Sequence, residues 1–274
     1  MDFHRFSKKS CKKNVFVVYF MQGIFQEREK NMVNRENKLF CDKRPLLIAH
    51  RGYTPIAPEN SLPSFLAAAK LGYWAIETDV HRTLDGVLVC CHDYSLQKMY
   101  GSPAVIEETP YAELKDFRVC RGNGLENFSA DELRLPLFEE YLDICASHGC
   151  VPFIETKGDV VEAVLHTVEK RGLTDTSVLS STKFAHIEEA RRLSDVFVHH
   201  IFSNIEKMQR IAEMGNGGLS YNYPNLDEVP SGLIEQTHAM GVKVCLRAGD
   251  DEETLAKMIA MGLDYIPTNR TLLR

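Results

Sequence analysis

The chain lacks the marks of several common protein classes. Its 274 residues include eight cysteines but no Cys-x-x-Cys pair, which argues against a zinc site and against a regular disulfide framework. It contains no internal repeat, no low-complexity block and no apolar run long enough to cross a bilayer. With 44% hydrophobic and 26% charged residues, the composition is that of an ordinary globular protein, and we expect a reducing compartment.

The main part of the chain also lacks an excess of positive charge. Residues 1–44 carry eleven Lys or Arg against five acids, a net charge of +6, so the remaining residues carry a net charge of −12. An acidic body argues against a broad nucleic-acid surface, because the affinity of such surfaces comes mainly from neutralised phosphates. We therefore expect a small-molecule partner and no nucleic acid.

Residues 1–44 form a basic N-terminal extension. Its segment 8–13 is followed by the apolar segment 15–25, which imitates a signal peptide but lacks a small-x-small cleavage site. The alternatives are a disordered arm, a membrane-surface tether, and a leader that is absent when synthesis begins at Met32. We expect a cytoplasmic protein rather than a secreted or tethered one, with any membrane contact made through residues 1–43.

Short β-rich runs alternate with helical patterns throughout residues 45–274. Segments such as 160–168 repeat their apolar residues with a period of 3.6, so each helix would bury one stripe against the strands. Eight such strand–helix units predict a single α/β domain, a (β/α)8 TIM-type barrel, with a doubly wound open sheet as the alternative. The expected strands are Leu46–Ala49, Trp74–Val80, Val151–Thr156, Ser177–Ser181, Val196–His200, Gly218–Tyr221, Val242–Leu246 and Asp264–Pro267.

A hairpin and a small cap are expected after the second barrel strand. Asp85-Gly86 stands between two apolar runs, which predicts a two-residue turn and places His92 across from Asp79 or its neighbour. The following residues, about 93–136, break the strand–helix rhythm. We expect them to form a cap over the mouth of the barrel.

Charged side chains stand where several expected strands end. Glu77 and Asp79 are two residues apart on a strand, so they share one face with their bases roughly 6 to 7 Å apart, and one cation can bridge them. Glu155 and Lys157 repeat this spacing on another strand. Three neighbouring acids repel one another unless a cation neutralises them, and their hard oxygen ligands suit Ca²⁺ or Mg²⁺.

Two histidines and an arginine complete this inventory. His50 and His92 carry imidazoles that titrate near neutrality, and the forked guanidinium of Arg51 matches two phosphate oxygens. In a barrel, all of these strand ends face one mouth. The residues together predict metal-assisted attack on a phosphate.

Six short motifs resemble those of the glycerophosphodiester phosphodiesterase family, in matching order and spacing over about residues 45–270. The resemblance implies a distorted eight-stranded barrel that hydrolyses glycerophosphodiesters to glycerol 3-phosphate and an alcohol. It implies Ca²⁺ or Mg²⁺ held by Glu77, Asp79 and Glu155, acid–base work by His50 and His92, and phosphate binding by Arg51 and Lys157. The motifs are His50-Arg51-Gly52, Pro58-Glu59-Asn60-Ser61, Ile76-Glu77-Thr78-Asp79-Val80, Thr83-Leu84-Asp85-Gly86, His92-Asp93 and Ile154-Glu155-Thr156-Lys157.

The chain departs from the family pattern near its C-terminus. Arg247-Ala248-Gly249-Asp250 stands where the family usually has Trp-Thr-Val-Asn. An aromatic wall is lost and a guanidinium is gained, which predicts a substrate with an extra anionic group rather than a choline headgroup. The alternative is that Arg247 points into solvent.

Several further residues have structural and functional interpretations. We expect Glu59 to orient Arg51 or to line the mouth, and Asn60 or Ser61 to cap the helix that follows, with a cap rather than a catalytic role for Asn60. His81 shares the strand face of Asp79 but lies beyond the expected strand end. An approach of His81 to the metal is therefore the less favoured interpretation. The adjacent His199 and His200 alternate faces, so at most one looks into the barrel, as a filler.

Two other functions are the alternatives. A lysophospholipase D-like enzyme of the same superfamily would need an apolar rim on the cap, where residues 93–136 have only scattered apolar side chains. A noncatalytic phosphate-binding barrel would be expected to have lost an acid–base residue, and none is missing.

Overall fold

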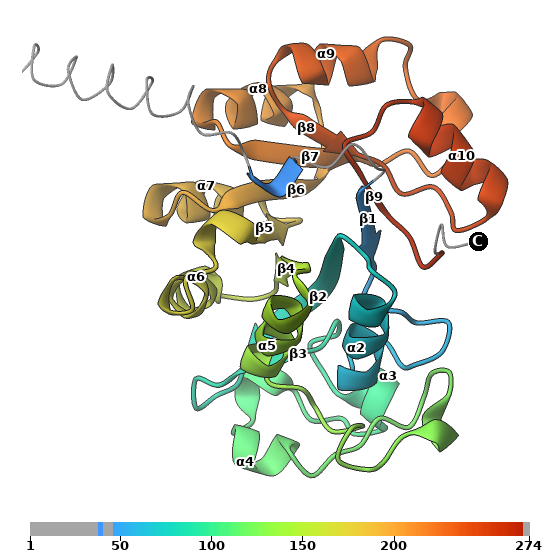
Figure 1. Ribbon diagram of the computed structural model, residues 1–274. Coiled ribbons are helices and arrows are strands. Elements are labelled where there is room, and N and C mark those ends of the chain that lie inside the picture. Colours follow the sequence, from blue (N-terminus) through green and yellow to red (C-terminus); the bar gives the residue numbers. More distant parts are fainter. Residues whose placement is uncertain (1–37, 41–45, 271–274) are drawn as a thin grey trace, which may run out of the picture. The chain divides into compact units, whose positions relative to one another are not determined.

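Eight parallel strands form a nearly closed barrel in the computed structural model, which describes residues 38–40 and 46–270 (Figure 1). The strands follow one another in the order β8-β7-β6-β5-β4-β2-β1-β9, and β3 pairs with β2 in antiparallel fashion outside this path. The prediction of a TIM-type barrel is confirmed, and the open sheet is excluded. The strands are β1 Leu46–Ala49, β2 Ala75–Arg82, β3 Leu88–Cys90, β4 Val151–Thr156, β5 Val178–Ser181, β6 Phe197–Ser203, β7 Gly217–Tyr221, β8 Lys243–Cys245 and β9 Tyr265–Pro267.

The seam between β8 and β9 is joined by an aspartate rather than by a regular ladder. The backbone N–H of Asp264 donates to the carbonyl of Val244 at 3.0 Å, and the N–H of Val244 donates to Asp264 Oδ2 at 2.8 Å. Lys243 Nζ pairs with the other carboxylate oxygen at 2.7 Å. Asp264 therefore satisfies backbone groups that a paired strand would otherwise satisfy.

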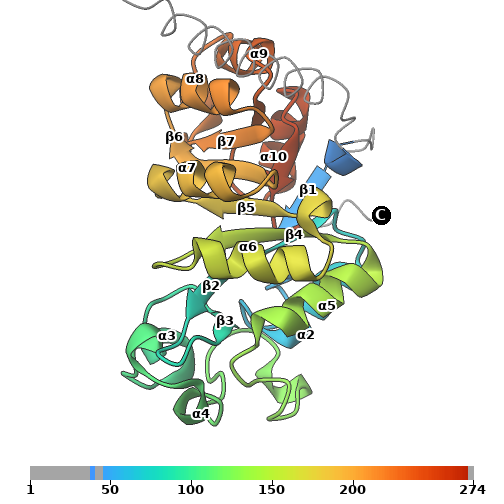
Figure 2. The same ribbon diagram turned by 90° about the vertical axis from the view of Figure 1, so that its left-hand side faces the viewer.

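Helices cover the outside of the strands (Figure 2). Ser61 caps α2: its hydroxyl accepts from Ser64 N, Ser64 Oγ accepts from Ser61 N, and Pro63 lies in the first turn. The expected start of this helix is confirmed, with Ser61 rather than Asn60 as its cap. The larger helices are α2 Leu62–Lys70, α5 Phe138–His148, α6 Val161–Lys170, α7 Phe184–Leu193, α8 Ile205–Met214, α9 Leu233–Ala239 and α10 Glu252–Ala260.

Side-chain alternation divides the strands between two apolar clusters. Ile48, Ala75 and Phe153 belong to the cluster inside the barrel, whereas Ile76 and Ile154 belong to the cluster under the helices. Because the strand period is two, Glu77 and Asp79 face the barrel axis on the same side of β2 as Ala75. Glu155 likewise faces the axis on the same side of β4 as Phe153.

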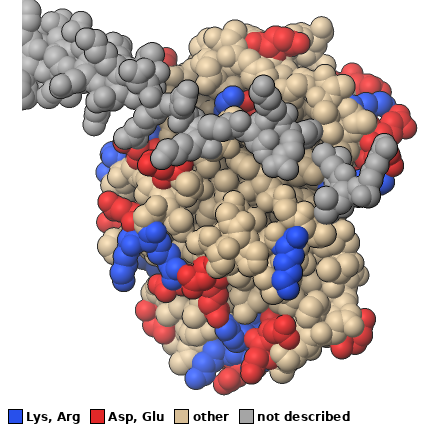
Figure 3. Space-filling view, in the orientation of Figure 1, with Lys and Arg blue, Asp and Glu red and all other residues tan. Residues whose placement is uncertain are grey.

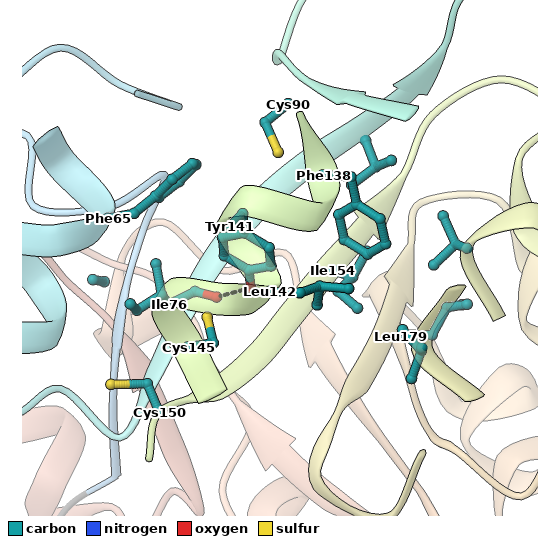
Figure 4. Packing of buried hydrophobic residues seen from close by; sticks show 14 of the residues in the cluster. Phe65, Ile76, Cys90, Phe138, Tyr141, Leu142, Cys145, Cys150, Ile154 and Leu179 are labelled. Carbon is teal, nitrogen blue, oxygen red and sulfur yellow. Dashed lines mark hydrogen bonds between the residues drawn. The ribbon is translucent and has the colours of Figure 1, made fainter. Parts of the chain in front are cut away.

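A tyrosine of α5 ties together the two strands that carry the acids (Figure 4). Tyr141 is fully buried, and its hydroxyl donates to the carbonyl of Ile76 on β2 at 2.6 Å and accepts from Phe153 N on β4 at 3.0 Å. Pro152, also on β4, has no N–H to donate at this point of the ladder. The tyrosine hydroxyl therefore bridges β2 and β4 just below the site.

The hairpin of β2 and β3 is confirmed, but its turn has three residues rather than two. Arg82 pairs with Leu88, and Thr83 N donates to the carbonyl of Val87, which leaves residues 84–86 as the loop. The Thr83 hydroxyl accepts from Val87 N and donates to Asp85 Oδ1, so a side chain closes the turn one residue earlier than the Asp-Gly pair predicts.

The insertion after β3 has an apolar core of its own. Leu96, Ile106, Leu114 and Leu135 are fully buried there together with Val89 of the hairpin. The segment therefore packs as a small unit beside the barrel. Its short elements are α3 Gln97–Tyr100, η2 Ile106–Glu108, α4 Tyr111–Leu114 and η3 Leu125–Asn127; elsewhere the short elements are η1 Lys38–Phe40, η4 Thr174–Thr176 and η5 Leu226–Glu228.

Part of the expected N-terminal extension contacts the barrel. Leu39 is buried, its carbonyl accepts from Trp74 Nε1 at 3.0 Å, and the Phe40 ring lies 5.0 Å from that of Phe197. The basic segment 8–13, the apolar segment 15–25 and Met32 lie outside the described residues. Within residues 38–40 and 46–270, no helix has the length and apolarity needed to cross a membrane.

On the face drawn in Figure 3, basic and acidic side chains lie beside one another. Surface ion pairs of this kind join Arg171 to Glu139 and Asp143, and Arg210 to Glu188. The six cysteines in the described part of the chain are free.

Candidate active site

Three carboxylates gather at the C-terminal ends of two neighbouring strands. Glu77 and Asp79 lie on β2 and Glu155 on β4, and each offers an oxygen atom within 4.8 Å of the others. The strand register places Asp79 directly beside Glu155. The structure therefore brings together the acids that the sequence proposed as metal ligands.

Asp79 is held from behind by an asparagine. Asn60 Nδ2 donates to Asp79 Oδ2 at 2.9 Å, while Asn60 Oδ1 accepts from the Thr78 hydroxyl at 2.7 Å and from Asp79 N at 3.3 Å. Asn60 is buried and has a left-handed backbone, with φ of 49°. The expectation that Asn60 caps the helix is wrong, because Ser61 does so, and Asn60 instead positions a carboxylate. Its place next to the cap hid this role in the sequence.

Arg51 lies across the acids and is oriented by Glu59. Its backbone N–H donates to Glu77 Oε2 at 2.7 Å, its Nη1 donates to Glu59 Oε1 at 3.1 Å, and its Nε lies 3.6 Å from Asp79 Oδ2. Lys98 of the insertion pairs with the same Glu59 oxygen at 3.2 Å. Burial in itself lowers the pKa of Arg51, but the neighbouring carboxylates outweigh it and raise the pKa above the ordinary value.

Lys157 is the second cation at the acids. Its Nζ lies 3.0 Å from Asp79 Oδ1 and also pairs with Glu155. Burial lowers its pKa in itself, but these two carboxylates hold the pKa above its ordinary value. Two cations against three carboxylates leave the cluster with one formal negative charge.

The residues present fit a divalent cation. Burial, and then the charges of neighbouring carboxylates, raise the pKa of both Glu77 and Glu155 above the ordinary value near 4.5. Asp79 Oδ1 is buried and, among the described groups, pairs only with Lys157 Nζ at 3.0 Å, so one of its two lone pairs is left for another ligand. A hard cation would reduce the repulsion among the three carboxylates and could occupy this lone pair.

His50 stands among positive charges. Burial, and then four surrounding groups, lower its pKa to about 2, so the imidazole is neutral at physiological pH. Within the described part of the chain, no carboxylate forms an ion pair with it. The surrounding groups are Arg247, Arg51, His92 and Lys157.

His92 has a carboxylate partner of its own. Its Nδ1 lies 2.6 Å from Asp93 Oδ1. Burial in itself raises the pKa of Asp93, but the hydrogen bond and charge of His92 outweigh it and lower the pKa below the ordinary value. Asp93 was not predicted to have a role, although it directly follows a candidate acid–base histidine in the sequence.

The remaining candidates divide between the site and the core. Arg247 is exposed, yet its charge acts on His50, so it lies on the side of the mouth near that imidazole. His199 lies inside the barrel, with Nδ1 2.6 Å from the Tyr265 hydroxyl, and the His200 ring packs on Phe184 under a helix, which confirms their alternation. His81 is buried under the insertion.

The sequence and the fold match proteins of one family. Residues 50–273 match the model of the glycerophosphoryl diester phosphodiesterase family. The glycerophosphodiester phosphodiesterase of Caldanaerobacter subterraneus subsp. tengcongensis is 25% identical over 235 residues, which are 82% of this chain and 94% of that protein.

Solved structures agree with this match. The structure of an Oleispira antarctica phosphodiesterase in complex with the product sn-glycerol-3-phosphate aligns with a TM-score of 0.74 and 25% identity, over 83% of this chain and 94% of that one. A glycerophosphodiester phosphodiesterase of Parabacteroides distasonis aligns with a TM-score of 0.70 and 26% identity, over 83% and 93% of the two chains. This chain therefore belongs to the glycerophosphoryl diester phosphodiesterase family.

Proposed function

We propose that this protein hydrolyses glycerophosphodiesters to glycerol 3-phosphate and an alcohol, and that it requires a divalent cation. The observation that carries the proposal is the gathering of three carboxylates, two imidazoles and two cations at one end of the barrel. The similarity to a phosphodiesterase bound to sn-glycerol-3-phosphate, the product expected here, supports the same activity.

Arg51 and Lys157 would bind the phosphate. Both are charged at any physiological pH, because their carboxylate neighbours raise their pKa values. The guanidinium offers paired N–H donors to two phosphate oxygens, and Glu59 fixes its orientation through Nη1. The two cations place the phosphorus between the histidines and stabilise the charge that grows on the nonbridging oxygens.

Glu77, Asp79 and Glu155 would hold the cation, which we propose to be Ca²⁺ or Mg²⁺. All three supply carboxylate oxygens, the donor type that these ions prefer. When bound, the cation supplies positive charge that draws electron density from the phosphate oxygens.

The two histidines would divide the proton transfers. His50 is neutral and can accept the proton of the nucleophile, and the negative charge of a bound phosphodiester would offset its cationic neighbours and increase its proton affinity. Asp93 accepts a hydrogen bond from Nδ1 of His92 and so orients its imidazole, whose other nitrogen can donate a proton to the departing alkoxide as the phosphorus–oxygen bond breaks. The same arrangement serves water as the nucleophile or the adjacent glycerol hydroxyl, which gives a cyclic phosphate first.

A release assay over a panel of substrates tests the function. Full-length protein should release glycerol 3-phosphate from glycerophosphodiesters with added Mg²⁺ or Ca²⁺, and exhaustive EDTA treatment should abolish the release until metal is restored. Release that continues unchanged in EDTA would contradict the metal requirement. Preference for lysophosphatidylcholine over every water-soluble diester would favour the lysophospholipase D-like alternative.

Arg247 gives the panel a specificity prediction. Because the charge of Arg247 acts on His50, we propose that it also attracts an anionic headgroup. Arg247→Ala should then lower kcat/KM for glycerophosphoserine or glycerophosphoinositol phosphate, relative to glycerophosphocholine. The expected loss is about 10-fold, the value of one favourable charge contact. The measurement is the ratio of kcat/KM values for the anionic and choline substrates. The proposal would be contradicted if this ratio equals that of wild type while the variant is slower on all substrates alike at low pH. Arg247 would then act only on the protonation of His50.

A further inference from the structure

A buried histidine lies between the insertion and the segment that carries His92. His81 follows Asp79 by two residues on β2 and has no solvent-exposed surface. Its Nε2 lies 3.5 Å from the backbone carbonyl oxygen of His92. A carbonyl oxygen only accepts hydrogen bonds, so Nε2 is the donor in this contact.

The other ring nitrogen of this histidine faces a carboxylate of the insertion. His81 Nδ1 lies 3.5 Å from Glu107 Oε1, and neither atom has a hydrogen bond to another described group. Both atoms are buried, so each is the other's polar neighbour in a place that water does not reach. The neutral imidazole carries one proton, and with that proton on Nε2 the Nδ1 atom is an acceptor like the carboxylate. Glu107 therefore encloses the ring without a hydrogen bond to it.

Glu107 is in turn placed by the loop that carries Lys157. A Cβ atom at Gly158 would overlap Glu107 Oε1, so a side chain at this position would displace the carboxylate from its present place. Gly158 also has a left-handed φ of 58°, which side chains disfavour. The absence of a side chain at position 158 thus lets the insertion approach the phosphate-binding loop.

The segment after His92 pairs with the segment before Glu107. Ile106 N donates to the carbonyl of Tyr94 at 2.9 Å, and Ser95 bridges to Val105. The Tyr94 ring meets the His81 ring edge-on, with centroids 4.9 Å apart. His81 is therefore enclosed by the two segments whose relative position it would fix.

We propose that His81 is a positioning residue for His92, and that Glu107 helps to enclose its ring; the inference rests on the proposed acid–base role of His92. Asp93 fixes the imidazole of His92 at Nδ1, and His81 fixes its backbone at the carbonyl. The two contacts together set where Nε2 of His92 meets the leaving group. A misplacement of such a group by about 1 Å can cost roughly 100-fold in rate.

Two substitutions of similar size separate positioning from packing. His81→Gln keeps an N–H donor near the place of Nε2, whereas His81→Asn is too short to reach the His92 carbonyl. We expect His81→Asn to lower kcat by about 10- to 100-fold, with KM changed by less than about threefold, and His81→Gln to recover most of that loss. Steady-state kinetics with glycerophosphocholine, at saturating Mg²⁺, measure the separation of kcat from KM.

Glu107 provides a second test with less risk to folding. Glu107→Ala should lower kcat in the same direction as His81→Asn, while Glu108→Ala, at an exposed neighbour on the same short element, should leave kcat at the wild-type value. The concentration of Mg²⁺ that gives half-maximal activity should be the same in all these variants.

The outcomes are separable from those of the proposed function. Equal kcat values for His81→Asn and His81→Gln, or an effect on KM alone, would overturn the positioning role even where His92→Ala is inactive. Full activity of His92→Ala would overturn the proposed mechanism first and the positioning role with it.

Discussion

Replacing His92 by alanine is expected to lower kcat for glycerophosphodiester hydrolysis by about 10²- to 10⁴-fold, the usual contribution of a positioned proton donor. His50→Ala should cause a loss of the same size. The two imidazoles carry different steps, because His92 is oriented by its hydrogen bond to Asp93, while burial and surrounding cations keep His50 neutral. Initial rates of glycerol 3-phosphate release at saturating substrate and Mg²⁺ measure both losses.

Each variant needs a control that separates chemistry from folding. His148, an exposed histidine on α5, is remote from the described acid cluster, so His148→Ala should retain wild-type kcat and a wild-type circular dichroism spectrum. His50→Ala and His92→Ala should show the same spectrum as wild type. Full activity in either would remove that histidine from the mechanism.

The barrel was predictable from the sequence because its strands obey simple rules. The expected strands Leu46–Ala49 and Val151–Thr156 coincide with β1 and β4, since each is a short apolar run buried on both faces. The hairpin turn was one residue off because the Thr83 side chain closes the loop before the Asp-Gly pair. Turn geometry of this kind depends on side-chain contacts that periodicity does not report.

The acids of the site were predictable for the same reason, but the residues that hold the site in position from other loops were not. The two-residue spacing of Glu77 and Asp79 on a strand is visible in the sequence and sets a shared face. Asn60 reaches Asp79 from a separate loop, and Glu107 reaches His81 from the insertion. Contacts between loops depend on the folded arrangement, so one sequence does not contain a local signal for them.

Glu77→Gln is expected to abolish the response of the protein to Mg²⁺ without lowering the stability of the metal-free form at pH 8. Glu77 is buried, and burial and its carboxylate neighbours raise its pKa, so the ionised form costs free energy when no cation is present. The neutral amide removes this cost, and its oxygen can still accept from Arg51 N. In the wild type, a group whose pKa is raised on folding loses stability as pH rises through that pKa, so Mg²⁺ should stabilise wild type most at the alkaline end.

Thermal unfolding with increasing Mg²⁺ measures this response. Saturation at 100 times the Kd should stabilise wild type by about 2.7 kcal/mol, whereas Glu77→Gln should show no shift of Tm over the same range. Glu140→Gln is the matched control, because Glu140 pairs with Arg134 outside the acid cluster and its loss should leave the Mg²⁺ shift intact.

Proton release gives an independent check of the same site. Because the pKa values of Glu77 and Glu155 are raised in the metal-free protein, Mg²⁺ must displace protons from them, and its affinity should increase as pH rises through their range. Calorimetric titrations over a range of pH, each in two buffers of different ionisation enthalpy, count the protons released. Binding of Mg²⁺ without proton release at any pH, and with an affinity that does not change with pH, would mean that the ion binds elsewhere.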